Sequence, residues 1–252
     1  MIRKTLLLAA VYASIPVFSS YALHVQEDFN YANFTNLGGQ NGYNAAYDSW
    51  AGQSWGTSGS IMTFNVYGQE GQYQSEDLAA YGGRDFPSAL RADINISYRM
   101  RTDYGPTTDS EAGELYFGSA LGIGPKIGFY YSGGTLHIRA RTYDGAGYVD
   151  LSSASQGVNY DISIDNVDFG ARTYRAGVNG GSYQTVKFAE NVDLGDLSWV
   201  RMHQDMWPGG RVLVTDNIDI QGEVPEPSSL ALFGIGILGL IGGCRTRAAK
   251  NT

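Results

Sequence analysis

Residues Arg91–Arg101 read RADINISYRMR, and this stretch decides the fold. Small or apolar residues alternate with polar ones along its whole length. Successive side chains of a strand point to opposite faces, so this period of two predicts a strand with one buried and one solvated face. Antiparallel sheets with one face in water have such strands. The expected buried face consists of Ala92, Ile94, Ile96, Tyr98 and Met100.

The same alternation recurs downstream of this stretch. It is present in TLHIRARTY (135–143), YDISIDNV (160–167), RTYRAGVN (172–179), SYQTVKFA (182–189), LSWVRMHQ (197–204) and RVLVTDNIDI (211–220). Gly133-Gly134 and Asn179-Gly180-Gly181 separate neighbouring segments, and such residues favour the tight turns of hairpins. About ten strands are expected in roughly 200 residues, which predicts two packed antiparallel sheets.

Composition agrees with an all-β fold. Of the 252 residues, 43% are hydrophobic, enough for a packed core, and 34 glycines and 18 tyrosines favour short strands joined by turns. Residues 38–59 are rich in glycine and polar side chains, and we expect a long loop there at the edge of the sandwich. Residues 221–226 are expected to link the body to a C-terminal tail. The only cysteine, Cys244, lies in that tail, so no intrachain disulfide can form.

The N-terminus has the pattern of a secretory signal peptide. Arg3 and Lys4 precede an apolar run, and small residues stand at Ser20 and Ala22. This order is what signal peptidase needs, so we expect residues 1–22 to be removed by cleavage after Ala22. A buried N-terminal helix is the alternative interpretation.

The C-terminal residues 223–250 read EVPEPSSLALFGIGILGLIGGCRTRAAK. Residues 228–244 carry no charge, and as a helix they would be about 25 Å long. Bilayers thin and flanking side chains extend to the interface, so we expect a single transmembrane helix at about 228–244. Arg245 and Arg247 of the basic end, 245–252, are expected to stay cytoplasmic, which leaves the body outside.

The sequence VPEP precedes this predicted helix. Pro225 and Pro227 keep Glu226 extended and exclude a helix there, so a processing enzyme could bind the segment as a strand. The Pro225-Glu226-Pro227 motif, the glycine-rich span and the basic end resemble the sorting tail of PEP-CTERM proteins. The resemblance implies that an exosortase recognises the tail at the membrane, removes it, and releases or attaches the body at the cell surface. A plain membrane anchor is the alternative.

The predicted body, residues 23–222, lies between the signal peptide (1–22) and the sorting tail (223–252). In their order along the chain, EDFNY (27–31), LGGQNG (37–42), YDISIDNVDFGARTYRAGVNGG (160–181) and VLVTDNIDI (212–220) resemble the laminin-G-like or concanavalin-like jelly-roll bodies of many PEP-CTERM proteins. The resemblance implies an antiparallel two-sheet jelly roll, with another β-sandwich or a barrel as the alternative. Such folds support lectin-like binding, glycan cleavage or structural roles, so the fold alone does not decide the function.

Charge limits the class of partner. The body holds 12 Lys and Arg against 23 Asp and Glu, a formal charge of −11 that repels nucleic acid. A neutral or cation-bridged exopolysaccharide is compatible with this charge, because sugars stack on aromatic rings and hydrogen-bond to amides. Tyr47, Trp50 and Trp55 lie in the glycine-rich segment and are the predicted carbohydrate platform. In the alternative interpretation, they anchor that loop in the core.

The carboxylates and histidines form no recognisable catalytic set in the sequence. Glu111 and Glu114 are the closest acidic pair for glycan cleavage, but Glu111 lies in a turn-like segment and we expect both to be solvated. His24, His137 and His203 lack the paired spacing of a zinc site. We therefore assign no catalytic residue and expect a protein that is not an enzyme. A secreted glycan hydrolase or lyase is the alternative.

Two acids have the strand parity of core residues, Glu27 in HVQEDFNY and Asp216 in RVLVTDNIDI. An isolated buried carboxylate costs several kcal/mol unless it is protonated, hydrogen-bonded or bound to a cation. Jelly rolls that resemble this body bring their first and last strands together, so we expect a structural Ca²⁺ between Glu27 and Asp216. A β-bulge that returns either acid to water, or a backbone hydrogen bond, is the alternative. A shifted parity would make Asp28 and Asp219 the ligands.

Together these features predict an exported, non-catalytic protein of the bacterial surface or extracellular matrix, associated with exopolysaccharide as in a biofilm. The chain is expected to pass through an inner-membrane intermediate with a cytoplasmic C-terminus before an exosortase acts on it. A permanently anchored surface protein remains as another alternative.

Overall fold

The computed structural model describes eight stretches of the chain. These stretches are 21–28, 51–54, 63–67, 70–75, 80–102, 109–144, 147–204 and 211–224. The predicted signal peptide up to residue 20 and the predicted transmembrane segment lie outside them. Within the eight stretches, no helix is long and apolar enough to cross a membrane.

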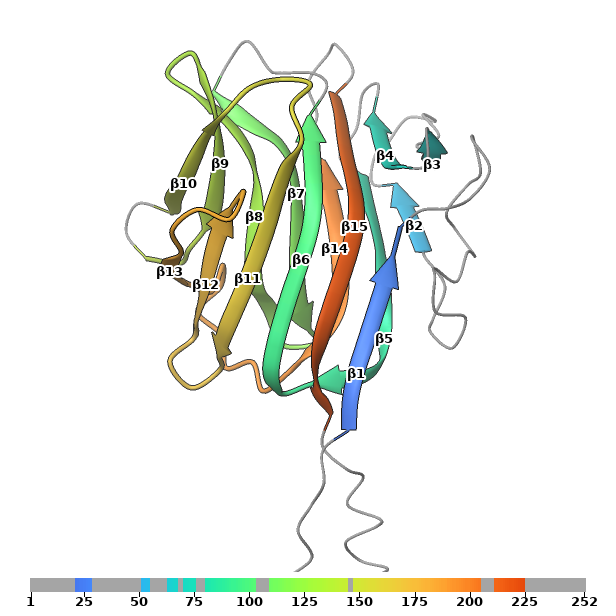
Figure 1. Cartoon of the computed structure of the whole chain (residues 1–252), viewed down its shortest axis with the longest axis vertical. Coiled ribbons are helices and arrows are strands. Elements are labelled where there is room, and N and C mark those ends of the chain that lie inside the picture. The colour runs from blue at the N-terminus through green and yellow to red at the C-terminus, as the bar shows by residue number, and fades with distance from the viewer. Residues whose placement is uncertain are drawn as a thin grey trace, which may run out of the picture. The chain divides into compact units, whose positions relative to one another are not determined.

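Two antiparallel β-sheets make up the body, residues 22–223 (Figure 1). One sheet has eight strands in the order β13-β12-β11-β6-β15-β4-β3, and β1 also pairs with β15. The other has seven strands in the order β10-β9-β8-β7-β14-β5-β2. The all-β, two-sheet expectation is confirmed, although the described residues contain fifteen strands, more than predicted.

The strand bounds are as follows. The eight-stranded sheet consists of β1 (Tyr21–Glu27), β3 (Thr63–Tyr67), β4 (Glu70–Ser75), β6 (Ala92–Thr102), β11 (Tyr160–Asp168), β12 (Thr173–Val178), β13 (Gln184–Lys187) and β15 (Arg211–Val224). The seven-stranded sheet consists of β2 (Ala51–Ser54), β5 (Ala80–Leu90), β7 (Ser110–Ser119), β8 (Gly122–Ser132), β9 (Thr135–Arg141), β10 (Tyr148–Ala154) and β14 (Leu197–Gln204).

Strand β6 has the predicted alternation. Ile94, Ile96, Tyr98 and Met100 are at most 2% exposed, whereas Ala92 at the start of the strand is exposed. Because β6 lies between β11 and β15, its buried side chains occupy the middle of the eight-stranded sheet. The pattern in Arg91–Arg101 therefore located a central strand of the fold.

Both predicted hairpin turns are present. Gly133 and Gly134, with φ of 59° and 80°, connect β8 to β9, where Ser132 pairs with Thr135. Asn179 and Gly180, with φ of 52° and 68°, connect β12 to β13. Positive φ at two successive positions matches the right-handed twist of the flanking strands, which explains the choice of glycine and asparagine.

The structure corrects two expectations about irregular segments. Residues 51–54 of the predicted loop form β2, which pairs with Gly82 and its neighbours in β5. Strand β15 continues through Val224, so residues 221–224 of the predicted linker belong to the sheet. Glu223 pairs there with Ala92. The extra strand residues follow from pairing with β5 and β6, which local composition does not report.

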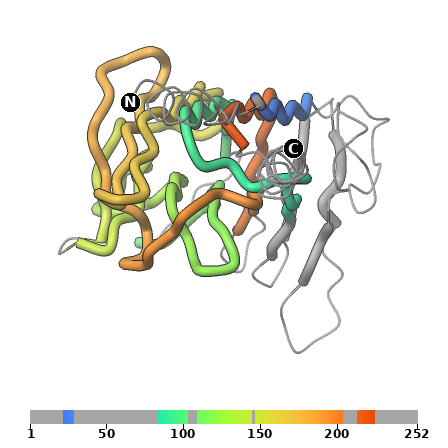
Figure 2. The backbone as a smooth tube through the Cα atoms, turned by 90° about the horizontal axis from the view of Figure 1, so that it is seen from below, coloured from blue at the N-terminus to red at the C-terminus, as the bar shows by residue number. Residues whose placement is uncertain are grey.

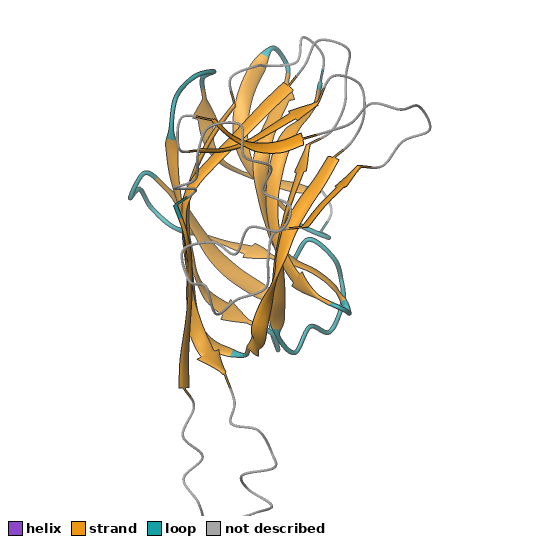
Figure 3. Cartoon of the chain, turned by 90° about the vertical axis from the view of Figure 1, so that its right-hand side faces the viewer, coloured by secondary structure: helices purple, strands orange, loops and turns teal. Residues whose placement is uncertain are grey.

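The core lies between the two sheets, which face each other in Figure 3. Aromatic pairs from opposite sheets meet there: Tyr98 with Phe117, with ring centroids 6.1 Å apart, and Tyr160 with Phe129, 6.0 Å apart. In Figure 2, which looks along the strands, β1 lies beside β15 at one part of the eight-stranded sheet. The inner faces are thus mainly apolar, with Glu27 and Arg84 among the buried charged residues.

Glu27 and Arg84 form a buried ion pair between the sheets. Glu27 ends β1 in the eight-stranded sheet, and Arg84 lies in β5 of the seven-stranded sheet. Both side chains are 1% exposed, and the Glu27 carboxylate oxygen Oε2 lies 4.0 Å from the nearest guanidinium nitrogen. Removing one partner of such a pair leaves an uncompensated charge in the core. The pair therefore links the N-terminal strand to the opposite sheet.

We predict that Glu27→Leu and Arg84→Met each lower the free energy of unfolding by about 3–5 kcal/mol, because each leaves one buried charge without its partner. The double variant should recover most of this loss, since it buries two apolar side chains instead. Denaturant unfolding of the three variants and the unmodified protein measures the cycle. Additive losses in the double variant would show that the two charges do not compensate each other.

Candidate functional site

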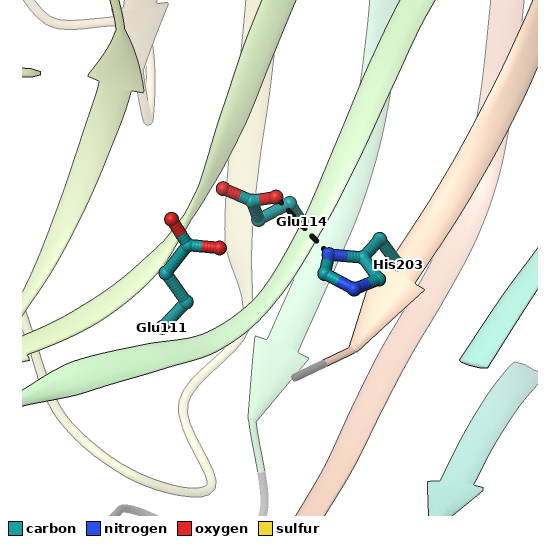
Figure 4. A group of neighbouring side chains, drawn as sticks. All are labelled: Glu111, Glu114 and His203. Atoms are coloured by element: carbon teal, nitrogen blue, oxygen red, sulfur yellow. Dashed lines mark hydrogen bonds and ion pairs between the residues drawn. The ribbon is translucent and has the colours of Figure 1, made fainter. Parts of the chain in front are cut away.

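A β-bulge in β7 brings Glu111 and Glu114 to one face of the seven-stranded sheet. Glu111 pairs with Tyr130 of β8 and Glu114 pairs with Gly128, with a register shift between them. Residues three apart point to opposite faces of a regular strand, but the extra residue of a bulge returns them to the same face. His203 of β14 pairs with Glu114 from the other side, so the three side chains converge (Figure 4).

Glu114 is fully buried, and three polar side chains hold its carboxylate. The Lys126 ammonium pairs with Oε2, and the Tyr130 hydroxyl donates to Oε1. The His203 nitrogen Nδ1 lies 3.4 Å from Oε2. Gly128 makes room for this arrangement, because a β-carbon there would lie 2.6 Å from the Glu114 Cγ. A buried carboxylate with this many donors keeps its charge without exposure to water.

Glu111 lies beside this network with its own two donors. Arg141 donates from a terminal guanidinium nitrogen to Oε1 at 3.1 Å, and the Tyr148 hydroxyl donates to the same oxygen at 2.9 Å. The rings of Tyr148 and Tyr130 have centroids 4.6 Å apart. This ring contact joins the partners of Glu111 to the partners of Glu114.

The two carboxylates differ in pKa. Burial raises the pKa of Glu111, and the negative charge of Glu114 raises it further. Burial also raises the pKa of Glu114, but the hydrogen bond to His203 and the charge of Lys126 outweigh burial and lower it. Burial and the Glu111 charge raise the pKa of Tyr148 to about 12, so its hydroxyl remains a donor. Glu114 is the ionised member of the pair, and Glu111 is the more readily protonated one.

Aromatic and charged side chains extend this surface across β14. The ring of Trp199 meets that of Tyr116 edge to face, with centroids 5.6 Å apart, and the Arg201 guanidinium carbon lies 5.1 Å from the Trp199 centroid. Gly118 leaves room for the Trp199 ring, because a β-carbon there would approach it to 2.5 Å. We call this surface the Glu114 face. Its members are Glu111, Glu114, Tyr116, Lys126, Tyr130, Arg141, Tyr148, Trp199, Arg201 and His203.

The Glu114 face has the ligand types of a metal site, but cationic side chains already neutralise its carboxylates. One ligand atom each of Glu111, Glu114 and His203 lie within 4.8 Å of one another. However, Lys126 already pairs with Glu114, and Arg141 pairs with Glu111. A cation would have to displace these two side chains to gain the carboxylates, so the geometry fits hydrogen bonding better than metal binding.

The structure corrects the expectation that Glu111 and Glu114 are solvated. The sequence predicts Glu111 in a turn-like segment, but both acids lie in β7, with Glu114 buried and Glu111 half-buried. His203, which the sequence did not link to either acid, completes the group. Its partnership depends on the pairing of β14 with β7, which are far apart in the chain, and on the bulge.

Glu27 has the core parity predicted for it, and Asp216 does not. Glu27 is buried as predicted and pairs with Arg84. A bulge in β15 at Asn217, with φ of 52°, shifts the register between Asp216 and Asp219 and sets Asp216 opposite Arg99 of β6. The core parity predicted for Asp216 is therefore wrong, for the reason that the alternative interpretation named.

The remaining predicted site residues are placed as follows. Glu27 lines one groove together with Asp28 and Asp219, the alternative calcium ligands. Calcium binding there or at Glu27 remains a prediction. The predicted carbohydrate platform of Tyr47, Trp50 and Trp55 lies outside the described residues, as do the sorting residues Pro225, Glu226, Pro227, Arg245 and Arg247.

Comparison with known proteins identifies the C-terminal tail and the fold. Residues 223–247 match the PEP-CTERM protein-sorting motif. A solved sialidase structure matches 79% of this chain at 11% identity and a TM-score of 0.56, but the match covers only 18% of the sialidase. The apo Crh5 transglycosylase matches over 80% of this chain and 85% of its own, at 11% identity and a TM-score of 0.50.

A third structure, reported with endo-acting O-glycanases of the human gut microbiota, matches 78% of this chain and 97% of its own, at 9% identity and a TM-score of 0.50. These identities support a common fold and nothing finer. Comparison with curated proteins gives no match.

The chain is therefore an all-β sandwich protein with a PEP-CTERM sorting motif. The motif implies an exported protein that passes through the membrane, is processed by an exosortase and is sorted to the cell surface.

We predict that Glu114→Gln lowers the pKa of Glu111 toward its ordinary value, because it removes a negative charge that raises this pKa. Carboxyl-carbon NMR titration of the glutamates measures the shift. Asp93→Asn is the matched control, since Asp93 is exposed on the other sheet and its loss should leave the Glu111 titration unchanged. An unchanged Glu111 pKa in Glu114→Gln would mean that burial alone sets it.

Proposed function

We propose that this protein is a non-catalytic, glycan-binding component of the bacterial surface or extracellular matrix. Its body, a concanavalin-like jelly roll, binds exopolysaccharide through the Glu114 face. Signal peptidase removes residues 1–22, and a helix at about 228–244 holds the chain in the inner membrane with a cytoplasmic C-terminus. An exosortase then cuts near Val224–Pro227 and delivers the body to the surface.

The observation that carries the binding proposal is the combination of aromatic rings and fixed polar groups on the Glu114 face. Tyr148 and Trp199 are half-buried, so part of each ring remains available to a ligand. Arg141 and Arg201 lie next to these rings, 5.9 Å and 5.1 Å from their centroids. A sugar offers C–H groups on its face and hydroxyls at its edge, and this surface supplies partners for both.

The charges of the Glu114 face are paired, which favours a neutral or weakly acidic glycan. Lys126, Arg141 and Arg201 pair with Glu114, Glu111 and Asp85, and the neighbouring Arg139 pairs with Asp150. A strongly anionic polymer would meet the net charge of −11 of residues 23–222. Nucleic acid is disfavoured for the same reason.

Burial of Glu114 supports binding without cleavage. Its side chain is 0% exposed, and three side chains occupy its two oxygens. A catalytic carboxylate must reach the glycosidic bond or the anomeric carbon. Glu114 would need to lose Lys126 and Tyr130 before it could do so.

A glycan-active enzyme is the second candidate, and one observation favours it. The pKa of Glu111 is raised while that of Glu114 is lowered, and their nearest oxygens lie within 4.8 Å. Two neighbouring carboxylates with opposite pKa shifts are the arrangement from which a general acid and a nucleophile are built. In this reading Glu111 would supply the proton and Glu114 would remain ionised.

We predict that replacing Pro225, Glu226 and Pro227 together by alanine leaves full-length protein in the membrane, because the extended segment that an exosortase binds is lost. Mass spectrometry of the protein recovered from membrane and surface fractions measures both cleavages. Alanine replacement of the adjacent Ser228 and Ser229 is the control and should be processed normally. Normal processing of the triple variant would contradict sorting through this motif, and an intact C-terminus on the unmodified protein would favour a permanent anchor.

We predict that Trp199→Ala weakens binding of exopolysaccharide from the producing cells by about tenfold, because it removes a stacking ring from the Glu114 face. Calorimetry with the full chain, in a detergent without sugar headgroups, measures the affinity. Val158→Ala, at an exposed apolar residue between β10 and β11, is the control and should bind normally.

Chromatography of exopolysaccharide that has been incubated with the protein decides between the two candidate functions. Unshortened polysaccharide is expected with the unmodified protein. Shortened products that disappear in Glu111→Gln or Glu114→Gln would establish the enzyme instead, and unchanged affinity in Trp199→Ala would remove the Glu114 face as the binding surface.

A further inference from the structure

The outer face of the eight-stranded sheet is hollowed by two adjoining grooves. One has a volume of about 250 Å³ and the other about 400 Å³, and both are lined by Ser97 of β6 and Asp219 of β15. Ser97 and Asp219 have the strand parity that points away from the core. The grooves therefore lie on the opposite side of the sandwich from the Glu114 face. We call their combined surface the Ser97 groove.

Strand register explains why the sheet is hollow at this place. Gly177, Ser163, Ser97 and Asp219 pair in succession across β12, β11, β6 and β15. The first three have small or absent side chains, whereas the next row on one side carries Asp161 and Arg99, which form an ion pair with a 2.9 Å contact. At about 4.8 Å between strands, the row is about 14 Å long, which suits a short oligosaccharide.

One end of the Ser97 groove carries a fixed aromatic ring. Tyr183 is 41% exposed and its ring lies flat over Gly177, where a β-carbon would touch three ring atoms at 3.4 Å. The Arg175 guanidinium carbon lies 5.2 Å from the ring centroid, and Arg175 donates two hydrogen bonds to Asp165 at 2.7 and 2.8 Å. The contacts with Gly177 and Arg175 hold the ring in place before any ligand arrives, which lowers the entropy cost of binding.

The other end carries a carboxylate with a fixed orientation. Asp219 accepts hydrogen bonds from Gln26 at 3.1 Å and from Gln221 at 3.0 Å, and the His24 nitrogen Nε2 lies 3.0 Å away. Burial raises the pKa of Asp219, but these hydrogen bonds outweigh it and lower the pKa, so the group is an acceptor at neutral pH. The bulge at Asn217 shifts the register of β15 against β6 beside it, and Asn217 lines the larger groove.

Hydroxyl and amide groups lie between these two ends. Ser97 and Ser163 line the smaller groove with hydroxyls, and Asn95 and Gln221 line it with amides. No hydrogen-bond partner for the two serine hydroxyls is found among the residues that the structure describes. A neutral sugar chain is bound by hydroxyls and amides, by carboxylates that accept hydrogen bonds from its hydroxyls, and by a ring on which a sugar packs.

We propose that the Ser97 groove is a second glycan-binding site, which holds a neutral oligosaccharide across the strands with one sugar packed on Tyr183. Asp165 and Asp219 would repel a polyanionic chain, so a neutral glycan is the ligand class. This site is independent of the Glu114 face, because the two surfaces lie on opposite sheets. Its variants therefore test it separately from the proposed function.

Saturation-transfer NMR and calorimetry of the full chain, in a detergent without sugar headgroups, test the proposal. The neutral probes are cellotetraose, laminaritetraose, maltotetraose and mannotetraose, and an oligouronate is the anionic comparison. All proteins carry Trp199→Ala, which is expected to weaken the Glu114 face about tenfold, so binding that is lost on substitution in the groove is assigned to the Ser97 groove. We expect at least one neutral probe to bind and the oligouronate not to bind. Ser97→Trp, which fills the groove from the solvent side, should abolish this binding, and Tyr183→Ala should weaken it about tenfold.

Gln156→Trp is the matched control, because it adds the same side chain at an exposed turn and should leave binding intact. Asn95→Ala combined with Gln221→Ala should also weaken binding, and it keeps the test valid if Ser97→Trp disturbs the sheet. Absence of neutral-probe binding in the Trp199→Ala protein would overturn the Ser97 groove, even if the Glu114 face binds. Binding that survives Ser97→Trp and the double alanine variant would overturn it as well.

Discussion

Each strand of the body gives one face to a shared apolar core, and this packing is the constraint on which the rest of the structure depends. The chain has a single cysteine, so no intrachain disulfide supports the two sheets. Burial of the inward side chains must supply most of the stability, and the Glu27–Arg84 pair adds a polar link between the sheets. Side chains of the opposite parity point outward and form the polar and aromatic groups of the two outer faces.

The regular alternation of the strands could be predicted from the sequence, but the β-bulges that interrupt it could not. β6, β9 and the turns at Gly133-Gly134 and Asn179-Gly180 could be predicted, because apolar spacing and positive-φ residues are local properties. The bulges in β7 and β15 insert one residue each, and every parity argument beyond them reverses. Gly113, with φ of 141°, was the available signal for the first bulge. Asp216 was misplaced for this reason, Glu111 and Glu114 were misplaced because their segment reads as a turn although it forms β7, and His203 was missed because its partner is on a neighbouring strand far away in the chain.

On both outer faces, cations are paired with carboxylates, which distinguishes these faces from a surface that binds polyanions. On the Glu114 face, Lys126 and Arg141 are committed to carboxylates, and on the other sheet Arg99 and Arg175 are likewise paired with Asp161 and Asp165. Paired charges give little long-range attraction, but they fix the positions of donors and acceptors. Both faces therefore present oriented hydrogen-bonding groups beside rings, while the net charge of the body still repels nucleic acid.

Strand pairing and proline also determine where the body ends and the tail begins. Val224 is 5% exposed and ends β15, and Glu223 still pairs with Ala92 of β6, so the sorting motif begins within the sheet. Proline at 225 has no backbone N–H to donate to a ladder, and a second proline at 227 prevents a helix from starting between them. Removal of the chain after this point would leave every residue of β15 and its pairing with β6 in place. The order of sheet, prolines and apolar span thus lets processing change the location of the body without changing its fold.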